Sequence, residues 1–223
     1  MINAPSLANC SLLDMGGAVD ELVSAGITRV HVDVMDGHYV PNLCFPPSFV
    51  GDLTARHPQL EVDVHLMVED PDRWIDVLAR AGARWVSFPS DSTRFARRTI
   101  AALKAAGLRA GVGLNPSQRV DVIEPYATDL DYVVLMAVEP GFSGQPFLPS
   151  TLDRLEQLVA LRDRNAASFV VEVDAGITEE TGRQCLQRGA EILVTGIYVT
   201  FNQPDGIAAA VRRFARQMAT VAG

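Results

Sequence analysis

The chain has 223 residues, of which 48% are hydrophobic and 21% are charged, a composition typical of a globular protein. Its formal net charge is −8, and no run of lysine or arginine interrupts this acidic excess. Nucleic acids and anionic membranes bind basic surfaces, so we expect neither as a partner. The length suits one domain, and we expect a single catalytic domain over residues 1–223.

The features that bear on location predict a cytoplasmic protein. No apolar stretch approaches the ~20 residues that a membrane span needs. The N-terminal residues MINAPS lack the basic and apolar regions of a signal peptide. Cys10, Cys44 and Cys185 are odd in number and widely spaced, which is typical of reduced, mostly buried thiols.

Short apolar segments alternate with amphipathic helical segments along the whole chain. Strands are predicted at residues 4–7, 29–35, 61–67, 85–88, 109–114, 132–136, 169–173 and 192–195. Helices are predicted at residues 14–25, 48–57, 72–81, 94–106, 120–126, 151–164, 179–188 and 204–218. Several helices are followed by a glycine that suits a left-handed C-cap, namely Gly26, Gly82, Gly107 and Gly189.

This alternation predicts an α/β protein, a single (β/α)8 barrel. A doubly wound open sheet is the alternative, but it usually has fewer strands. The first strand-to-helix turn also lacks the Gly-x-Gly-x-x-Gly pattern of that fold. In (β/α)8 barrels the chemistry lies at the C-terminal ends of the strands, so polar residues at those ends are candidate site residues.

The second and third predicted strands each present polar residues on one face. His31, Asp33 and Met35 alternate with valines, and side chains of a strand point to opposite faces in turn. The third strand repeats this pattern with Asp63, His65 and Met67. A face of this composition is poor core material and indicates the wall of a reaction chamber.

The seventh predicted strand leads to Asp174, which completes a set of four ligand-type residues with His31, Asp33 and His65. Two imidazoles and two carboxylates suit one divalent metal ion, with Zn²⁺ as our first expectation and Fe²⁺, Mn²⁺ or Co²⁺ as alternatives. The competing interpretation is a set of buried polar residues that satisfy one another's hydrogen bonds.

Asp33 and Asp174 are expected on opposite sides of the barrel mouth, which indicates two groups that act as general base and general acid. One carboxylate would remove a proton alpha to a carbonyl and the other would return it on the opposite face, while the metal stabilises the enediolate oxygen. Met35, Met67 and Met136 are expected to line the same chamber as a polarizable, water-excluding cap, although methionine is more often core filler.

A glycine-rich turn follows the sixth predicted strand at residues 140–145 (PGFSGQ). Glycines let a backbone approach a ligand closely and aim successive amides at an anion. Gly176 and Gly196 follow the seventh and eighth strands, the usual phosphate corner of these barrels. The three loops together predict a phosphate-binding site.

Six stretches carry a family resemblance: residues 4–6 (APS), 31–42 (HVDVMDGHYVPN), 63–67 (DVHLM), 114–116 (LNP), 136–147 (MAVEPGFSGQPF) and 172–174 (EVD). Over nearly its whole length the chain resembles the ribulose-phosphate 3-epimerase family. The resemblance implies a metal held by His31, Asp33, His65 and Asp174, and a reaction in which Asp33 and Asp174 invert C3 of a ketose phosphate. It implies substrate contacts from Ser6, Met35, His65, Met67, Met136, Gly141, Phe142, Ser143, Gly144, Ala175, Gly176, Gly196 and Ile197.

The chain departs from the family pattern at three places. Ala175 stands in Asp174-Ala175-Gly176 where the family usually has Asp-Gly-Gly, and Ile197 stands where the family usually has serine after Gly196. Pro89 stands where the fourth strand normally ends in histidine. The catalytic set implied by the resemblance is therefore intact, while the set implied for substrate recognition is altered.

Three functions stay open on these grounds. The first is epimerisation of D-ribulose 5-phosphate. The second is epimerisation of another ketose phosphate, such as allulose 6-phosphate, whose branch the segment at residues 5–13 and the Gly-Gln-Pro-Phe run resemble more. The third is a metal-binding barrel without turnover. The resemblance also implies a homo-oligomer, and the apolar segment at residues 43–49 is expected either to pack on a neighbour or to cover its own barrel.

Overall fold

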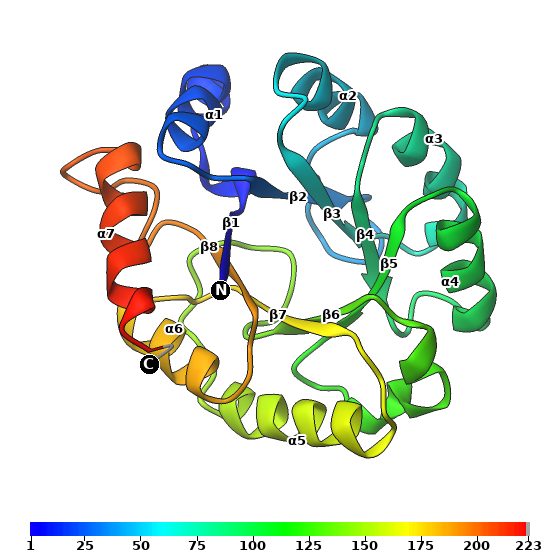
Figure 1. The fold of residues 1–223 in the computed structure, drawn as a ribbon. Helices are drawn as coiled ribbons and strands as arrows, with labels where there is room; N and C mark the ends of the chain where they lie inside the picture. Colours follow the sequence, from blue (N-terminus) through cyan, green and yellow to red (C-terminus); the bar gives the residue numbers. More distant parts are fainter. Residues whose placement is uncertain (222–223) are drawn as a thin grey trace.

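The computed structural model of the protein describes residues 1–221 and is an eight-stranded parallel barrel ringed by helices (Figure 1). The strands are β1 Ile2–Pro5, β2 Arg29–Met35, β3 Glu61–Met67, β4 Trp85–Pro89, β5 Arg109–Leu114, β6 Tyr132–Met136, β7 Val170–Asp174 and β8 Ile192–Thr195. Strand pairing runs β1-β8-β7-β6-β5-β4-β3-β2, and a parallel bridge between Ser6 and His31 joins the two ends. The predicted (β/α)8 barrel is confirmed.

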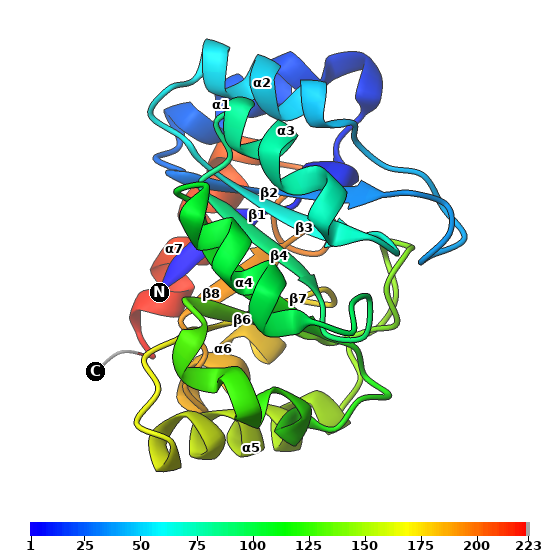
Figure 2. The same cartoon turned by 90° about the vertical axis from the view of Figure 1, so that its right-hand side faces the viewer.

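The helices lie outside the strands, as the side view in Figure 2 also shows. The α-helices are α1 Met15–Ser24, α2 Pro47–Arg56, α3 Ile75–Arg80, α4 Ala96–Ala105, α5 Ser150–Arg164, α6 Glu179–Gln187 and α7 Ile207–Ala219. Shorter-pitch 3₁₀ helices are η1 Leu7–Asn9, η2 Leu12–Asp14, η3 Pro71–Trp74 and η4 Val120–Asp129. Within residues 1–221, no helix is both long enough and apolar enough to cross a bilayer.

The predicted elements differ most from the structure at four places. The first strand ends at Pro5 rather than at residue 7, because the chain turns into η1. The segment predicted as a helix at 120–126 is the 3₁₀ helix η4, which contains Pro125, a residue without the N–H that an α-helix needs. The helix predicted at 204–218 begins at Ile207, because Gly206 before it has a φ of 80°. The helix predicted at 72–81 is divided between η3 and α3.

The hydrophobic core lies between the strands and the helices rather than inside the barrel. Val32 and Val34 of β2 are buried there, as are Val62 and Val64 of β3, with apolar residues of the helices packed against the same cluster. The polar residues of these strands consequently face the interior of the barrel. The alternation predicted from the sequence is confirmed. The free energy gained by burying apolar area on the outer faces of the strands offsets the unfavourable burial of polar groups inside the barrel.

The N-terminal end of the barrel is closed by a packed aromatic and ionic layer. The Arg29 guanidinium lies 4.0 Å from the centre of the Trp85 ring, and its Nη2 lies 2.7 Å from Oε2 of Glu61. The Trp85 ring in turn meets Tyr132 edge-on at 5.2 Å. Access to the polar interior is therefore from the C-terminal ends of the strands.

The segment at residues 43–49 packs on its own barrel. Phe45 is buried and stacks on Phe49, with ring centres 4.3 Å apart, whereas Leu43 is 74% exposed. Of the three cysteines, Cys185 is buried and Cys10 and Cys44 are half-buried, and all three are free thiols, so the prediction of unpaired cysteines is confirmed.

Candidate active site

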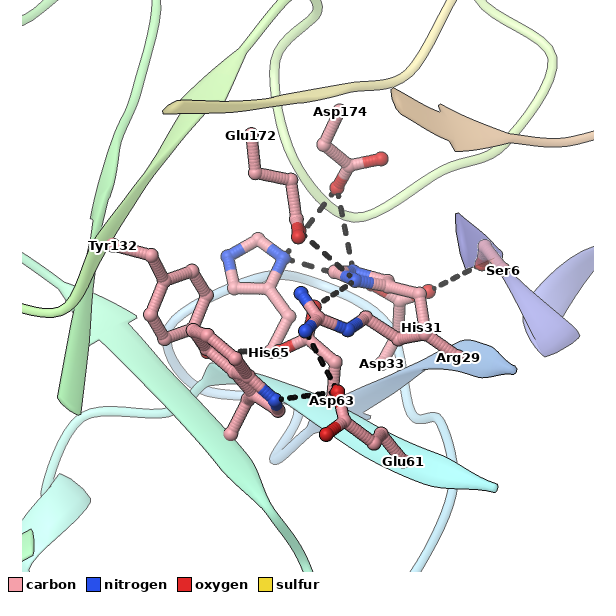
Figure 3. Close-up of polar contacts among 11 residues, drawn as sticks. Ser6, Arg29, His31, Asp33, Glu61, Asp63, His65, Tyr132, Glu172 and Asp174 are labelled. Atoms are coloured by element: carbon pink, nitrogen blue, oxygen red, sulfur yellow. Dashed lines mark hydrogen bonds and ion pairs between the residues drawn. The ribbon is translucent and has the colours of Figure 1, made fainter. Parts of the chain in front are cut away.

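Four side chains converge at the C-terminal ends of β2, β3 and β7 (Figure 3). Nε2 of His31 lies 3.5 Å from Oδ1 of Asp33 and 3.6 Å from Oδ2 of Asp174. Nδ1 of His65 lies 3.7 Å and 3.5 Å from the same two oxygens. Strand register explains this meeting, because His31 pairs with Asp63 and Asp33 with His65 across β2 and β3. The two nitrogens and two oxygens therefore face a common point.

This arrangement fits a bound cation better than a self-satisfied polar cluster. Nε2 of His31 and Nδ1 of His65 are buried and have no hydrogen-bond partner among residues 1–221, and separations of 3.5 Å or more are too long for good hydrogen bonds. Tetrahedral Zn²⁺ with bonds of ~2.0–2.2 Å spaces its ligand atoms by roughly 3.3–3.6 Å. Two carboxylates beside neutral imidazoles also carry the charge that a divalent ion balances.

The two imidazoles and the two carboxylates also shift one another's pKa. Burial by itself lowers the pKa of His65, but the carboxylates of Asp174 and Asp33 outweigh it and raise that pKa to about 9. Burial likewise opposes ionisation of Asp33, yet His31 and His65 hold the pKa of Asp33 below its usual value. Protons and a metal ion would therefore compete for these imidazole nitrogens.

A second polar layer lies directly beneath the four ligand-type groups. Nδ1 of His31 lies 3.2 Å from Oδ2 of Asp63 and 3.3 Å from Oε1 of Glu172, and Tyr132 donates a 2.8 Å hydrogen bond to Oδ1 of Asp63. Burial, and after it the charge of Asp63, raises the pKa of Glu172 to about 8. Asp63 is thus the charged partner that fixes the orientation of the His31 ring, as second-layer carboxylates do for metal-binding histidines.

A cavity opens above the four groups. Ser6 lies at its wall and donates a 2.7 Å hydrogen bond to Oδ2 of Asp33. Met35, Met67 and Met136 line it beside Asp33 and Asp174. His31 and His65 lie below the cavity floor, and a side chain at Gly113 would come within 3.3 Å of the His65 ring. The cavity therefore gives a ligand access to both carboxylates and to three thioethers.

The far corner of the cavity consists of backbone from three loops. Its lining includes all the remaining predicted contact residues: Gly141, Phe142, Ser143, Gly144, Ala175, Gly176, Gly196 and Ile197. Within residues 1–221, the amides of Gly176, Gly196 and Ile197 donate no hydrogen bond to the protein. A side chain at Gly176 would come within 2.7 Å of the Phe147 backbone, so this turn needs glycine. Unpaired amides around a cavity form a binding surface for an anion.

Ala175 precedes this glycine with a φ of 78°, a left-handed conformation that costs an L-residue roughly 1–2 kcal/mol. Alanine in place of the usual glycine therefore strains the backbone at this position. Pro89, the third departure, ends β4 opposite Gly113 and is not part of the cavity lining.

The structure brings the sequence-predicted residues together and adds others. The cavity lining also includes Asn9, Val138, Pro140, Ile177, Val194, Thr195 and Tyr198. Asp63 and Glu172 share strand faces with His65 and Asp174, so the two-residue alternation was a usable signal for the lower layer. Asn9 ends the short 3₁₀ helix η1 and Tyr198 lies in the loop after β8, where no periodic pattern points to them.

The chain is similar in sequence to a known protein family. The profile of the ribulose-phosphate 3 epimerase family matches residues 2–200. Ribulose-phosphate 3-epimerase of Bacillus subtilis (strain 168) is 38% identical over 203 residues, which cover 91% of this chain and 93% of that protein. The protein of the same name from Aquifex aeolicus (strain VF5) is 36% identical over 193 residues, 86% of each chain.

Solved structures with little sequence similarity share the fold. The structure of 3-hexulose-6-phosphate synthase from Salmonella typhimurium has a TM-score of 0.71 at 15% identity, covering 98% of this chain and 100% of that chain. KGPDC from Streptococcus mutans has a TM-score of 0.71 at 16% identity, covering 100% and 99%. At these identities the likeness shows the barrel fold alone.

Proposed function

We propose a function on the premise that the chain belongs to the ribulose-phosphate 3-epimerase family and is an enzyme of the isomerase class. The proposed reaction is metal-dependent inversion of C3 of a ketose phosphate, D-ribulose 5-phosphate to D-xylulose 5-phosphate or a close analogue. The observation that carries this proposal is the facing set of two imidazole nitrogens and two carboxylate oxygens beneath a cavity.

His31, Asp33, His65 and Asp174 would hold one divalent ion, and Zn²⁺ is the first candidate for this N₂O₂ donor set. Such an ion would supply positive charge next to the carbonyl oxygen of the substrate and lower the cost of negative charge developing there. Asp63 would keep the His31 ring aimed at the ion through its 3.2 Å contact with Nδ1.

Asp33 and Asp174 would move the protons. Both carboxylates border the cavity and are only 6% and 7% exposed, so a bound substrate reaches them while bulk water is largely excluded. One carboxylate would take the proton from C3 and the other would deliver a proton to the opposite face of the same carbon. The Ser6 hydroxyl, 2.7 Å from Asp33, would hold that carboxylate in place.

The rest of the cavity would position the sugar phosphate. Met35, Met67 and Met136 would cover the reacting carbons with polarizable, apolar surface. The phosphate would lie in the corner formed by Gly141–Gly144, Gly176 and Gly196, where unpaired amides stand in for basic side chains on a protein of net charge −8. Assembly into a homo-oligomer stays a prediction.

Proton exchange at C3 tests the proposed mechanism. Wild-type protein incubated with D-ribulose 5-phosphate in D₂O should incorporate deuterium at C3, followed by NMR. Asp33→Asn and Asp174→Asn should each lose net epimerisation, because either substitution removes one of the two proton handlers. Full activity in either variant would refute the two-carboxylate mechanism.

The identity of the ketose is a separate question. Ala175 and Ile197 line the phosphate corner and depart from the family pattern, so another ketose phosphate is the second candidate. Allulose 6-phosphate is the one named, because residues 5–13 and the Gly-Gln-Pro-Phe run resemble that branch more. A panel of pentulose and hexulose phosphates, each with its unphosphorylated form, should show one preferred phosphorylated sugar. Equal rates with and without the phosphate would contradict the assignment of the corner. No turnover of any sugar by metal-loaded protein would favour a binding role for the barrel.

A further inference from the structure

The loop that follows β6 is held in place through its carbonyl groups. Nδ2 of Asn42 donates a 2.8 Å hydrogen bond to the Gly141 carbonyl, from the loop after β2. Nε2 of Gln145 donates to the carbonyls of Glu139 and Phe142, at 2.7 Å and 2.9 Å. The Tyr198 hydroxyl donates a 2.8 Å hydrogen bond to the Gly144 carbonyl. Side chains, rather than a backbone ladder, therefore define the conformation of this loop.

The amides of the same loop are left without partners. Within residues 1–221, none of the backbone N–H groups of residues 141–145 donates to a protein acceptor. The peptide bonds of this loop are trans, so each N–H points away from the carbonyl of its own peptide group. Fixing the carbonyls of Gly141, Phe142 and Gly144 thus also fixes the directions of the amides of Phe142, Ser143 and Gln145.

Tyr198 joins two walls of the proposed anion site, the part of the cavity lined by Gly141–Gly144, Gly176 and Gly196. It lies in the loop after β8, next to Ile197, and both residues line the cavity together with Gly144. A side chain at Gly144 would come within 3.3 Å of Cδ1 of Ile197, so the two loops are already in close approach. Tyr198 as a whole residue is 41% exposed, and its hydroxyl is the group that connects it to the glycine loop.

We propose that Tyr198 is a positioning residue for anion binding, which holds the glycine loop closed so that its free amides meet the phosphate of the substrate. The hydroxyl acts through the loop backbone and has no role in proton transfer. We call the hydrogen bond from the Tyr198 hydroxyl to the Gly144 carbonyl the latch. The latch rests on this contact, and only the identification of the anion as a ketose phosphate rests on the proposed function.

Tyr198→Phe removes this hydroxyl and keeps the ring. Inorganic phosphate, titrated by ³¹P NMR, should bind the variant about fivefold more weakly than wild type, the change expected for one hydrogen bond. With phosphate present near its wild-type dissociation constant, so that the phosphate protects the amides it binds, amide hydrogen exchange of residues 141–145 should be faster in the variant than in wild type, while the barrel strands are unaffected. In the epimerase assay, KM for the phosphorylated sugar should rise by a similar factor, with kcat changed less than about twofold, as for loss of uniform binding.

Tyr126→Phe is the matched control, since Tyr126 lies in η4 and does not line the cavity. It should leave phosphate binding and loop exchange as in wild type. Equal phosphate affinity and equal loop exchange in Tyr198→Phe and wild type would overturn the latch, as would failure of wild type to bind phosphate. If wild type binds phosphate but epimerises no ketose phosphate, the proposed function fails while the phosphate titration and the exchange data still decide the role of Tyr198.

Discussion

Asp63→Asn tests whether the buried layer beneath the candidate metal site positions His31. Asparagine has nearly the shape of aspartate and keeps a carbonyl oxygen for the Tyr132 hydroxyl, which donates to Asp63 at 2.8 Å. It removes the negative charge 3.2 Å from Nδ1 of His31. Both side chains are fully buried, so solvent does not screen this interaction.

Loss of a second-layer carboxylate typically weakens metal binding 10- to 100-fold, or about 1.4–2.7 kcal/mol. We expect the affinity of Asp63→Asn for Zn²⁺ to fall within this range. The dissociation constant would be measured at pH 7 by competition with a chromophoric chelator. Circular dichroism at the same pH would verify that the barrel is folded.

Glu172→Gln is the matched control within the same layer. The pKa of Glu172 is raised to about 8 by burial and by the charge of Asp63, so at pH 7 its carboxyl is mostly protonated and glutamine is a close replacement. We expect its Zn²⁺ affinity to stay within about threefold of wild type, well short of the usual second-layer loss. An Asp63→Asn variant that binds Zn²⁺ as tightly as wild type would refute the positioning role of this layer.

Three further predictions follow from the site. Glu172 has a raised pKa in the folded protein, so wild type binds more protons folded than unfolded and loses stability as pH rises from about 4.5 to about 8. The free energy of unfolding of metal-free Glu172→Gln, measured in urea, should therefore rise relative to that of wild type by more than about 1 kcal/mol over this pH range. A difference between the two proteins that does not change with pH would contradict a protonated Glu172. Ala175→Gly should stabilise the protein by about 0.5–1 kcal/mol, because the strain of a left-handed alanine exceeds the entropy cost of glycine; a loss of stability in the same measurement would count against strain at this turn. Removal of metal by a chelator should abolish epimerisation and added Zn²⁺ should restore it, whereas unchanged rates in metal-free protein would remove the ion from the mechanism.

The predictable part of the site consists of residues on regular strands. His31 and Asp33 follow a two-residue alternation on β2, and the same alternation places His65 on the inner face of β3. This pattern is local, so it survives in the sequence without knowledge of the partner strands. The less predictable part lies in loops and element ends, such as the start of α7 after Gly206 and the 3₁₀ helix around Pro125.

The sequence by itself determined the fold class and the inward-facing residues of the strands, because apolar periodicity and strand alternation depend only on neighbours along the chain. The tertiary structure alone decided that the imidazole nitrogens of His31 and His65 lie 3.5–3.7 Å from carboxylate oxygens of Asp33 and Asp174, since this spacing depends on strand register and on closure of the barrel between Ser6 and His31. It also decided that Tyr198 reaches the Gly144 carbonyl. That contact joins loops more than fifty residues apart, and loop conformation follows from such long-range packing rather than from local sequence.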